Sequence, residues 1–154
     1  GAYRHAGAAQ QVWFPETIEQ LARGVLDMDG FKAVNDDHGH EQGDELLRQF
    51  GARLSAGVRK TDMVARLAGD EFVVVLEMLA DAADAEDTAR KLLDRLREPY
   101  LLGSASVTVG ASIGIALHRP DDPPDVEAWM VRADHAMYAV KRTGKNGVAL
   151  AAVA

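Results

Sequence analysis

The sequence predicts an α/β fold of the α+β sandwich type, with helices flanking a central mixed, mainly antiparallel sheet of about five strands. Two observations predict it. Short apolar runs of strand length alternate with longer segments whose apolar residues recur every three or four positions. Two strand-like runs, Asp62–Leu67 and Glu71–Glu77, are separated by a tight turn, which indicates an antiparallel hairpin. The expected core order is βαββαβ.

Residues 1–22 are expected to form an N-terminal arm followed by a helix. No sustained period precedes Pro15, which suits the first turn of a helix. The narrow apolar face of that helix is formed by Ile18, Leu21 and Ala22. Residues 23–154 are expected to form one globular domain, because a chain of 154 residues can bury a single core without staples.

The rest of the domain follows from apolar periodicity. The expected strands share short apolar runs and lie at Arg23–Asp27, Asp62–Leu67, Glu71–Glu77, Ser106–Leu117 and Asn146–Leu150. The expected helices share an apolar stripe and lie at about His40–Arg59, Asp81–Arg97 and Asp125–Arg142, after a shorter helical region from Phe31 that Gly39 interrupts. Ser106–Leu117 gives the longest strand signal and is expected to be a central strand.

Composition excludes several classes of function. The chain has no cysteine, so it has no disulfide, thiolate nucleophile or cysteine zinc site. Its net charge of −7 argues against nucleic acid as a partner, although one nucleotide needs only a few local cations. No apolar run approaches the roughly 20 residues that span a bilayer. We therefore expect no membrane contact by this domain and a cytoplasmic location, alone or as the cytoplasmic portion of a larger, membrane-attached protein.

Two pairs of acidic residues carry the strongest chemical signal. Asp70 and Glu71 stand at the tip of the expected hairpin, where adjacent carboxylates repel each other unless a cation holds them. Asp27 and Asp29 end the first expected strand. Hard divalent cations prefer oxygen ligands, so the two pairs together indicate a magnesium and triphosphate site. The alternative for Asp27 and Asp29 is a turn at the end of a strand.

Four motifs in this order resemble the GGDEF domain of diguanylate cyclases. They are Asp27–Asp36, Gly39–Asp44, Arg66–Phe72, and Ala133–Tyr138 with Lys141 and Gly144–Asn146. The resemblance extends from about Gly24 to Val148 and implies a nucleotidyl-cyclase-like fold. It implies that two GTP molecules condense to cyclic di-GMP and two pyrophosphates on a homodimer, with two Mg²⁺ or Mn²⁺ ions in each half of the active site. It also implies a fused sensory domain in the parent protein.

The resemblance assigns a role to each matching residue. The implied metal ligands are the carboxylates of Asp27, Asp70 and Glu71 and the backbone carbonyl of Met28. Either Asp70 or Glu71 would also act as the catalytic base for the ribose hydroxyl. The implied substrate-binding residues are Asn35, His40 and Asp44 near guanine, Lys32, Lys141 and Lys145 near the phosphates, and Gly69.

Each substrate-binding residue also has a structural alternative. Asn35 and Asp44 favour helix ends and could be caps, and His40 could have a structural role at a helix N-terminus. A single lysine is more often solvated on the surface. Phe31 and Phe72 are expected in the core.

Arg59 and Asp62 have the Arg-x-x-Asp spacing and the position of the family's inhibitory product site. The resemblance therefore implies that cyclic di-GMP is both the product and an allosteric inhibitor. Arginine can grip guanine or phosphate through its planar fork. The alternative is an ordinary charged helix end.

The chain departs from the family pattern in three places. Ala68 replaces the first glycine of the signature, which would cost roughly 1 kcal/mol if that backbone needed a positive φ. Lys145 stands where the family commonly has arginine. The upstream Asp-x-Leu-Thr-x-Leu-x-Asn-Arg segment is missing. The alternative function is therefore a catalytically weak or inactive GGDEF module that senses GTP or cyclic di-GMP.

Overall fold

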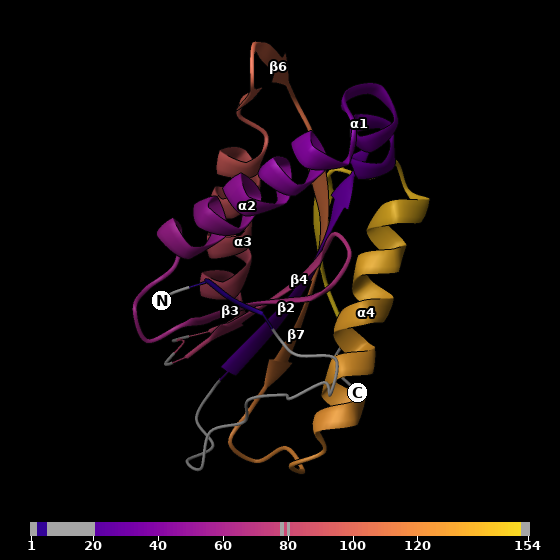
Figure 1. Ribbon diagram of the computed structural model, residues 1–154. Helices are drawn as coiled ribbons and strands as arrows, with labels where there is room; N and C mark the ends of the chain where they lie inside the picture. Colours follow the sequence, from indigo (N-terminus) through magenta and orange to yellow (C-terminus); the bar gives the residue numbers. More distant parts are fainter. Residues whose placement is uncertain (1–2, 6–20, 78, 80, 152–154) are drawn as a thin grey trace.

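The computed structural model describes residues 3–5, 21–77, 79 and 81–151. Within these ranges the core is a six-stranded sheet with the order β1-β3-β4-β2-β7-β8 (Figure 1). Its strands are β1 (Tyr3–His5), β2 (Leu21–Asp29), β3 (Met63–Ala68), β4 (Glu71–Leu76), β7 (Gly110–His118) and β8 (Gly147–Leu150). The three inner pairs are antiparallel and the two outer pairs are parallel, which confirms the predicted mixed, mainly antiparallel sheet.

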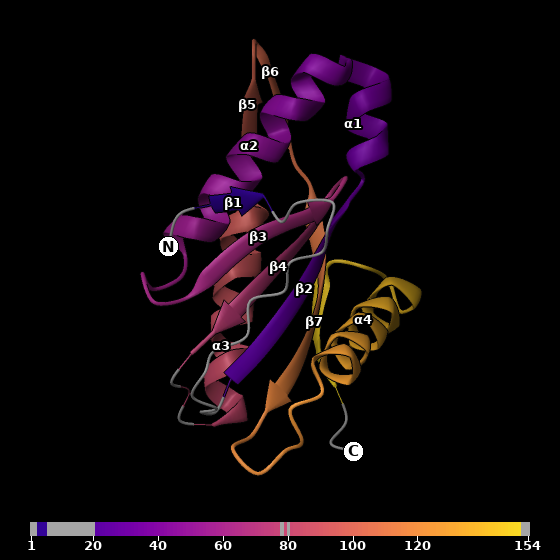
Figure 2. The same ribbon diagram turned by 60° about the horizontal axis from the view of Figure 1, so that its bottom comes forward.

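Helices cover both faces of the sheet. They are α1 (Phe31–His38), α2 (His40–Ala56), α3 (Ala82–Leu96) and α4 (Val126–Arg142). Figure 1 shows α2 and α3 on one face and α4 on the other. Figure 2 shows α1 at the same end of the molecule as a separate hairpin of β5 (Tyr100–Leu102) and β6 (Ala105–Val107). Within the described ranges, no helix has the length and apolar character needed to cross a bilayer.

Alternation along β2 divides the core in two. Leu26 and Met28 belong to a large cluster beneath α2 and α3, where the Phe50 and Phe72 rings lie 5.1 Å apart. Leu21 and Val25 belong to a smaller cluster beneath α4. Successive strand residues point to opposite faces, so Arg23, Asp27 and Asp29 are directed toward the α4 side. The expected core position of Phe72 is confirmed, and Phe31 packs against the larger cluster.

Helix α4 lies unusually close to the sheet at Gly114. A Cβ at this position would lie 2.2 Å from the backbone nitrogen of Met137 and 2.3 Å from the carbonyl oxygen of Ala133. The Trp129 indole also donates a 2.8 Å hydrogen bond to the carbonyl of Ala116. These contacts fix α4 over β7 and thereby fix the position of Lys141 near its C-terminus.

The structure corrects three sequence-based boundaries. Leu21 and Ala22, expected in a helix, are the first residues of β2; the rest of that expected helix lies outside the described residues. The N-terminal arm, whose anchoring could not be derived from the sequence, contributes β1, which pairs in parallel with β3. The expected strand Ser106–Leu117 is broken, because residues 105–107 pair with Tyr100–Leu102 across Gly103, which has a φ of 62°. Alternation alone does not reveal a strand's partner.

The ends of the helices shift by one to three residues. Asp81 and Asp125, expected as first helical residues, are N-caps whose side chains accept hydrogen bonds from the backbone N–H groups of Asp84 and Ala128, both at 3.0 Å. Helix α2 ends at Ala56 instead of Arg59. Aspartate at an N-cap satisfies a backbone donor that the helix leaves unpaired, so the first turn starts one residue later.

Candidate active site

The end of β2 and the β3–β4 hairpin bring the two acidic segments together. Asp27 of β2 lies directly opposite Glu71 of β4 in the sheet register. The backbone N–H of Met28 donates a 3.3 Å hydrogen bond to the carbonyl of Asp70. The sheet therefore places Asp27, Asp70 and Glu71 at one end of the molecule, as the sequence predicted.

The hairpin turn is formed without strain at Ala68. Gly69 takes the left-handed conformation, with a φ of 49°, and its carbonyl accepts a 2.6 Å hydrogen bond from the Arg66 side chain. The β3–β4 register shifts between Arg66 and Ala68. Among the described residues other than glycine, positive φ values occur at Lys145 and Asn146, and not at Ala68. The alanine in the signature therefore does not carry the cost considered from the sequence.

The carboxylates at this end repel one another. Burial raises the pKa of Asp70 to about 6, assisted by Asp27, which accepts a hydrogen bond from the protonated form and adds its own negative charge. Burial also raises the pKa of Glu71, together with the charges of Asp134, Asp27 and Asp70. Such repulsion is relieved by a proton or by a cation.

Lys141 of α4 supplies one positive charge. Its Nζ donates a 2.5 Å hydrogen bond to Oδ2 of Asp27. Burial disfavours the charged lysine, but the bond to Asp27 and the charges of Asp27, Asp70 and Asp29 outweigh it and raise the pKa of Lys141. Lys141, expected at the phosphates, thus lies on a carboxylate expected to bind metal.

The donor set fits Mg²⁺. With the acids ionised, Oδ1 of Asp27 is buried and accepts no hydrogen bond from the described residues. Among the described residues, no three acidic or histidine side chains come together in a group that could hold a metal ion by itself. Mg²⁺ does not need one, because it is commonly held by one or two carboxylates together with water and substrate phosphates. Asp27, Asp70 and the Met28 carbonyl are the groups suited to such an ion.

Asp29 has a different environment. Its Oδ1 accepts a 2.9 Å hydrogen bond from the Ser112 hydroxyl, and its Oδ2 accepts a 2.8 Å bond from the backbone N–H of Asn146. The structural alternative considered for the aspartate pair therefore describes Asp29.

The residues expected near guanine lie on α1 and α2. The side chain of Asn35 lies against Gly43, where a Cβ would come within 1.7 Å of the Asn35 Oδ1. That oxygen is buried and has no hydrogen-bond donor within the described part of the chain. Asp44 follows Gly43 and is exposed. The caps of these helices are Gly30 and Gly39, so neither Asn35 nor Asp44 serves as an N-cap.

Asp44 lines a groove of about 420 Å³ between α2 and the β5–β6 hairpin. Its walls include Glu41, Arg48 and Leu101, and Leu101 is 66% exposed. His40 is exposed at the start of α2. Lys32, near the start of α1, and Lys145, after α4, are also exposed.

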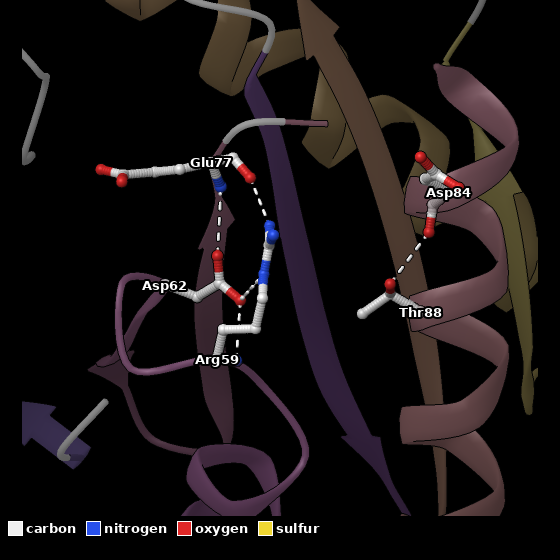
Figure 3. A network of polar contacts seen from close by, with 5 residues as sticks. All are labelled: Arg59, Asp62, Glu77, Asp84 and Thr88. Carbon is white, nitrogen blue, oxygen red and sulfur yellow. Dashed lines mark hydrogen bonds and ion pairs between the residues drawn. The ribbon is translucent and has the colours of Figure 1, made fainter. Parts of the chain in front are cut away.

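Arg59 and Asp62 lie at the opposite side of the sheet from α4, and Figure 3 shows their contacts. Asp62 is 5% exposed and accepts three hydrogen bonds: 2.8 Å from the Arg59 backbone, 3.4 Å from the Arg59 side chain and 3.1 Å from the Glu77 backbone. The Arg59 guanidinium also donates to the carbonyl of Glu77. Asp62 therefore braces the segment between α2 and β3.

A groove of about 490 Å³ opens beside this pair. One wall contains Arg59 and Asp62, and the other is formed by α3 with Asp84 and Thr88 (Figure 3). Lys91 also lines this wall. The Arg59 side chain is 56% exposed and reaches this space, whereas that of Asp62 is nearly inaccessible. The pair thus presents mainly its arginine to a ligand.

Sequence reasoning assigned no role to two residues around the site. Arg23 is 2% exposed; burial lowers its pKa, while Asp134 and Glu71 oppose that shift. A basic residue inside an apolar strand is the sequence signal for such a buried charge. Gly43 was overlooked as well, although glycine is disfavoured inside a helix and therefore indicates a packing requirement.

Comparison with known proteins identifies relatives of this arrangement. Residues 16–147 match the family described as diguanylate cyclase, GGDEF domain. The chain is 48% identical over 122 residues to the bifunctional diguanylate cyclase/cyclic di-GMP phosphodiesterase MucR of Pseudomonas aeruginosa, covering 79% of this chain and 18% of MucR. It is 40% identical over 137 residues to the diguanylate cyclase TpbB of the same species, covering 88% of this chain and 31% of TpbB. The chain thus spans less than a third of these curated relatives.

Solved structures give the same result. The GGDEF domain of TpbB, also called YfiN, superposes with a TM-score of 0.82 at 39% identity, covering 88% of this chain and 84% of that one. The active GGEEF domain of a diguanylate cyclase from Vibrio cholerae superposes with a TM-score of 0.79 at 26% identity, covering 88% and 85%.

Proposed function

Because this chain belongs to the diguanylate cyclase, GGDEF domain family, we propose that it condenses two GTP molecules to cyclic di-GMP and two pyrophosphates. The family membership confirms the resemblance drawn from the four sequence motifs. The observation that carries the proposal is the cluster of Asp27, Asp70 and Glu71, in which the pKa values of Asp70 and Glu71 are raised. The Lys141 ammonium opposes the repulsion through its hydrogen bond to Asp27.

Asp27, Asp70 and the Met28 carbonyl would hold Mg²⁺ or Mn²⁺, with Glu71 as a further oxygen ligand and two ions in each half of the active site. The chemistry that such an ion would supply is neutralisation of the negative charge on the phosphates. Lys141 adds positive charge from α4, Lys145 adds it from the turn after α4, and Lys32 adds it from α1. Helix α1 starts just after β2, so its unpaired N–H groups lie at the same end of the sheet and favour an anion.

Asn35 and Asp44 read guanine, with His40 beside them. The Asp44 carboxylate accepts hydrogen bonds from the N1–H and the N2 amino group of guanine. The Asn35 amide donates to O6 or N3. The Asn35 side chain lies against Gly43, the residue before Asp44, so α1 and α2 bring the two polar residues into the same region. Gly69 lies at the hairpin tip, where the absence of a side chain lets substrate approach the backbone.

The reaction requires two subunits. Each holds one GTP, and the 3′-hydroxyl of each nucleotide attacks the α-phosphate of the other. A P–O bond forms, the bond to pyrophosphate breaks, and a carboxylate of the Asp70–Glu71 pair accepts the hydroxyl proton. A homodimer is therefore the active species, and positioning supplies much of the acceleration.

The groove beside Arg59 and Asp62 binds cyclic di-GMP, and the bound product inhibits the enzyme. Arg59 is exposed to the groove and provides a planar fork for guanine or phosphate. Asp62 holds the Arg59 backbone in place by accepting its N–H, and so keeps the arginine side chain directed at the groove. Product bound there prevents the two substrate sites from meeting.

The test is product formation from GTP and Mg²⁺ across a range of protein concentrations. We expect cyclic di-GMP by chromatography, with a specific activity that rises with protein concentration because the dimer is the catalyst. A specific activity independent of concentration would contradict the dimeric mechanism. Complete absence of product at high concentration would favour a module that senses GTP or cyclic di-GMP. The exposed Arg59 side chain in its groove supports this module as the second candidate.

A further inference from the structure

The turn between α4 and β8 has an unusual backbone. Lys145 and Asn146 have φ values of 62° and 50°, and Gly144 before them has a φ of 118°. Residues other than glycine rarely adopt this left-handed backbone conformation, and two such residues in succession are uncommon. Such a conformation persists only where the surroundings determine it strongly. The surroundings of this turn must therefore hold it in place.

Asp29 at the end of β2 provides that hold. Its Oδ2 accepts the backbone N–H of Asn146 at 2.8 Å, and its Oδ1 accepts the hydroxyl of Ser112 in β7 at 2.9 Å. Both carboxylate oxygens are thus engaged, one by the turn and one by the neighbouring strand. The carboxylate connects the strand that carries Asp27 to the turn that carries Lys145.

Contacts on either side of Asp29 complete the arrangement. Gly110, which pairs with Asp29, has no side chain, and a Cβ there would lie 2.6 Å from the Asn146 Oδ1. The backbone N–H of Lys145 donates a 3.0 Å bond to the carbonyl of Val140 at the end of α4. Asn146 is therefore held through its backbone N–H, and its side chain fits because Gly110 has no Cβ.

We infer that Asp29 is a positioning residue that fixes the Lys145–Asn146 turn and directs Lys145 toward the nucleotide phosphates. The inference rests on the proposed function for the role of Lys145. The two aspartates of β2 then have separate tasks. Asp27 faces the cation, and Asp29 builds the turn that presents a lysine to the anion. Two residues on one strand set the distance between these charges.

The test compares Asp29→Ala with Asp29→Asn. The ligand is 3′-deoxy-GTP with Mg²⁺, which lacks the attacking hydroxyl and reports binding without turnover. Asp29→Ala removes both acceptors, so we expect at least about tenfold weaker binding by calorimetry. In Asp29→Asn the amide oxygen can accept from Asn146 while its NH₂ donates to the Ser112 hydroxyl. We expect this variant to stay within about threefold of the parent. Equal losses in both variants would overturn a positioning role, because the charge itself would then be responsible.

Two further measurements separate this inference from the proposed function. Hydrogen exchange of the Asn146 amide should accelerate in Asp29→Ala and not in Asp29→Asn; unchanged exchange in Asp29→Ala would overturn the inference without any nucleotide. Lys145→Ala should itself weaken binding, and adding Asp29→Ala to it should change binding by less than about twofold, because the effects pass through one lysine. Additive losses would overturn the inference alone. Unaltered binding by Lys145→Ala would overturn the phosphate role on which it rests.

Discussion

The acidic residues at the two sides of this domain differ in how their oxygens are satisfied. At the β3–β4 hairpin, Asp70 and Glu71 lie near Asp27 and their pKa values are raised. At the Arg59 groove, Asp62 is more deeply buried, yet it accepts three hydrogen bonds from Arg59 and Glu77. Burial alone therefore does not decide whether a carboxylate is a ligand or a brace. The supply of donors decides it.

This difference has opposite consequences for stability and function. A buried carboxylate with several donors stabilises the fold, whereas a cluster with too few donors costs free energy until a cation arrives. Raised pKa values in a cleft are common at functional sites for this reason. Variants at the two sides should therefore separate activity from stability.

The largest effect should come from Asp70→Ala. Loss of a metal ligand next to Asp27 should reduce cyclic di-GMP formation at least about a thousandfold, measured by chromatography. A matched control is Asp94→Ala, an aspartate on α3 whose side chain is 72% exposed. That variant should remain within about twofold of the parent. Normal turnover by Asp70→Ala would remove Asp70 from the catalytic site.

Asp62→Ala should lower the free energy of unfolding by about 2–3 kcal/mol, because it leaves the backbone donors of Arg59 and Glu77 without their acceptor. Urea denaturation of parent and variant gives the difference. Asp94→Ala again serves as the control and should change stability by less than about 0.5 kcal/mol. If Asp62→Ala also lowered the free energy of unfolding by less than about 0.5 kcal/mol, the hydrogen bonds of Asp62 would not brace the fold.

Arg59→Ala should relieve product inhibition with little loss of stability. The side chain is largely exposed, so its removal should raise the inhibitory concentration of cyclic di-GMP about tenfold, which corresponds to roughly 1.4 kcal/mol. Initial rates at increasing product concentration measure this effect. Arg97→Ala, an exposed arginine at the end of α3, is the matched control. Unchanged inhibition in Arg59→Ala would exclude the groove as the inhibitory site.

The smallest effect should be the pH dependence of stability without divalent ions. The pKa of Asp70 is about 6 in the folded chain and ordinarily 3.8, so the folded state binds more protons between these values. Its stability should therefore fall as pH rises from about 4 to 6, by about 1 kcal/mol after screening by water. Asp70→Asn should flatten this part of the urea-midpoint profile. If the urea midpoints of the parent and of Asp70→Asn rose in parallel between about pH 4 and 6, the raised pKa of Asp70 and the repulsion behind it would be contradicted.

The sequence was sufficient for the features that depend on local pattern. The hairpin around Gly69 and the separation of α1 from α2 at Gly39 were predicted because glycine and apolar periodicity act locally. The break before Gly110 was not predicted, because it depends on which segment pairs with residues 105–107. The register that sets Asp27 opposite Glu71 confirmed the expected meeting of two distant segments.

Contacts between distant side chains could not be predicted. The sequence showed Lys141, Asp29 and Asp62 as residues of suitable chemistry, but it did not show that Lys141 binds Asp27 or that Asp29 binds the Asn146 backbone. It also did not show that Asp62 is already saturated by neighbouring donors. These properties depend on atomic distances across the sheet, which one strand's sequence does not contain.

The close approach of α4 at Gly114 limits which sequences this fold can tolerate. Any side chain there would push the helix backbone away from β7 and carry Lys141 with it. A saturation library at position 114, selected for nucleotide binding, should therefore return glycine alone. Neighbouring Ile113, on the other face of the sheet, should accept several aliphatic substitutes. Substitution at position 114 is thus restricted by contact with the backbone of α4, and not by a chemical role of the residue.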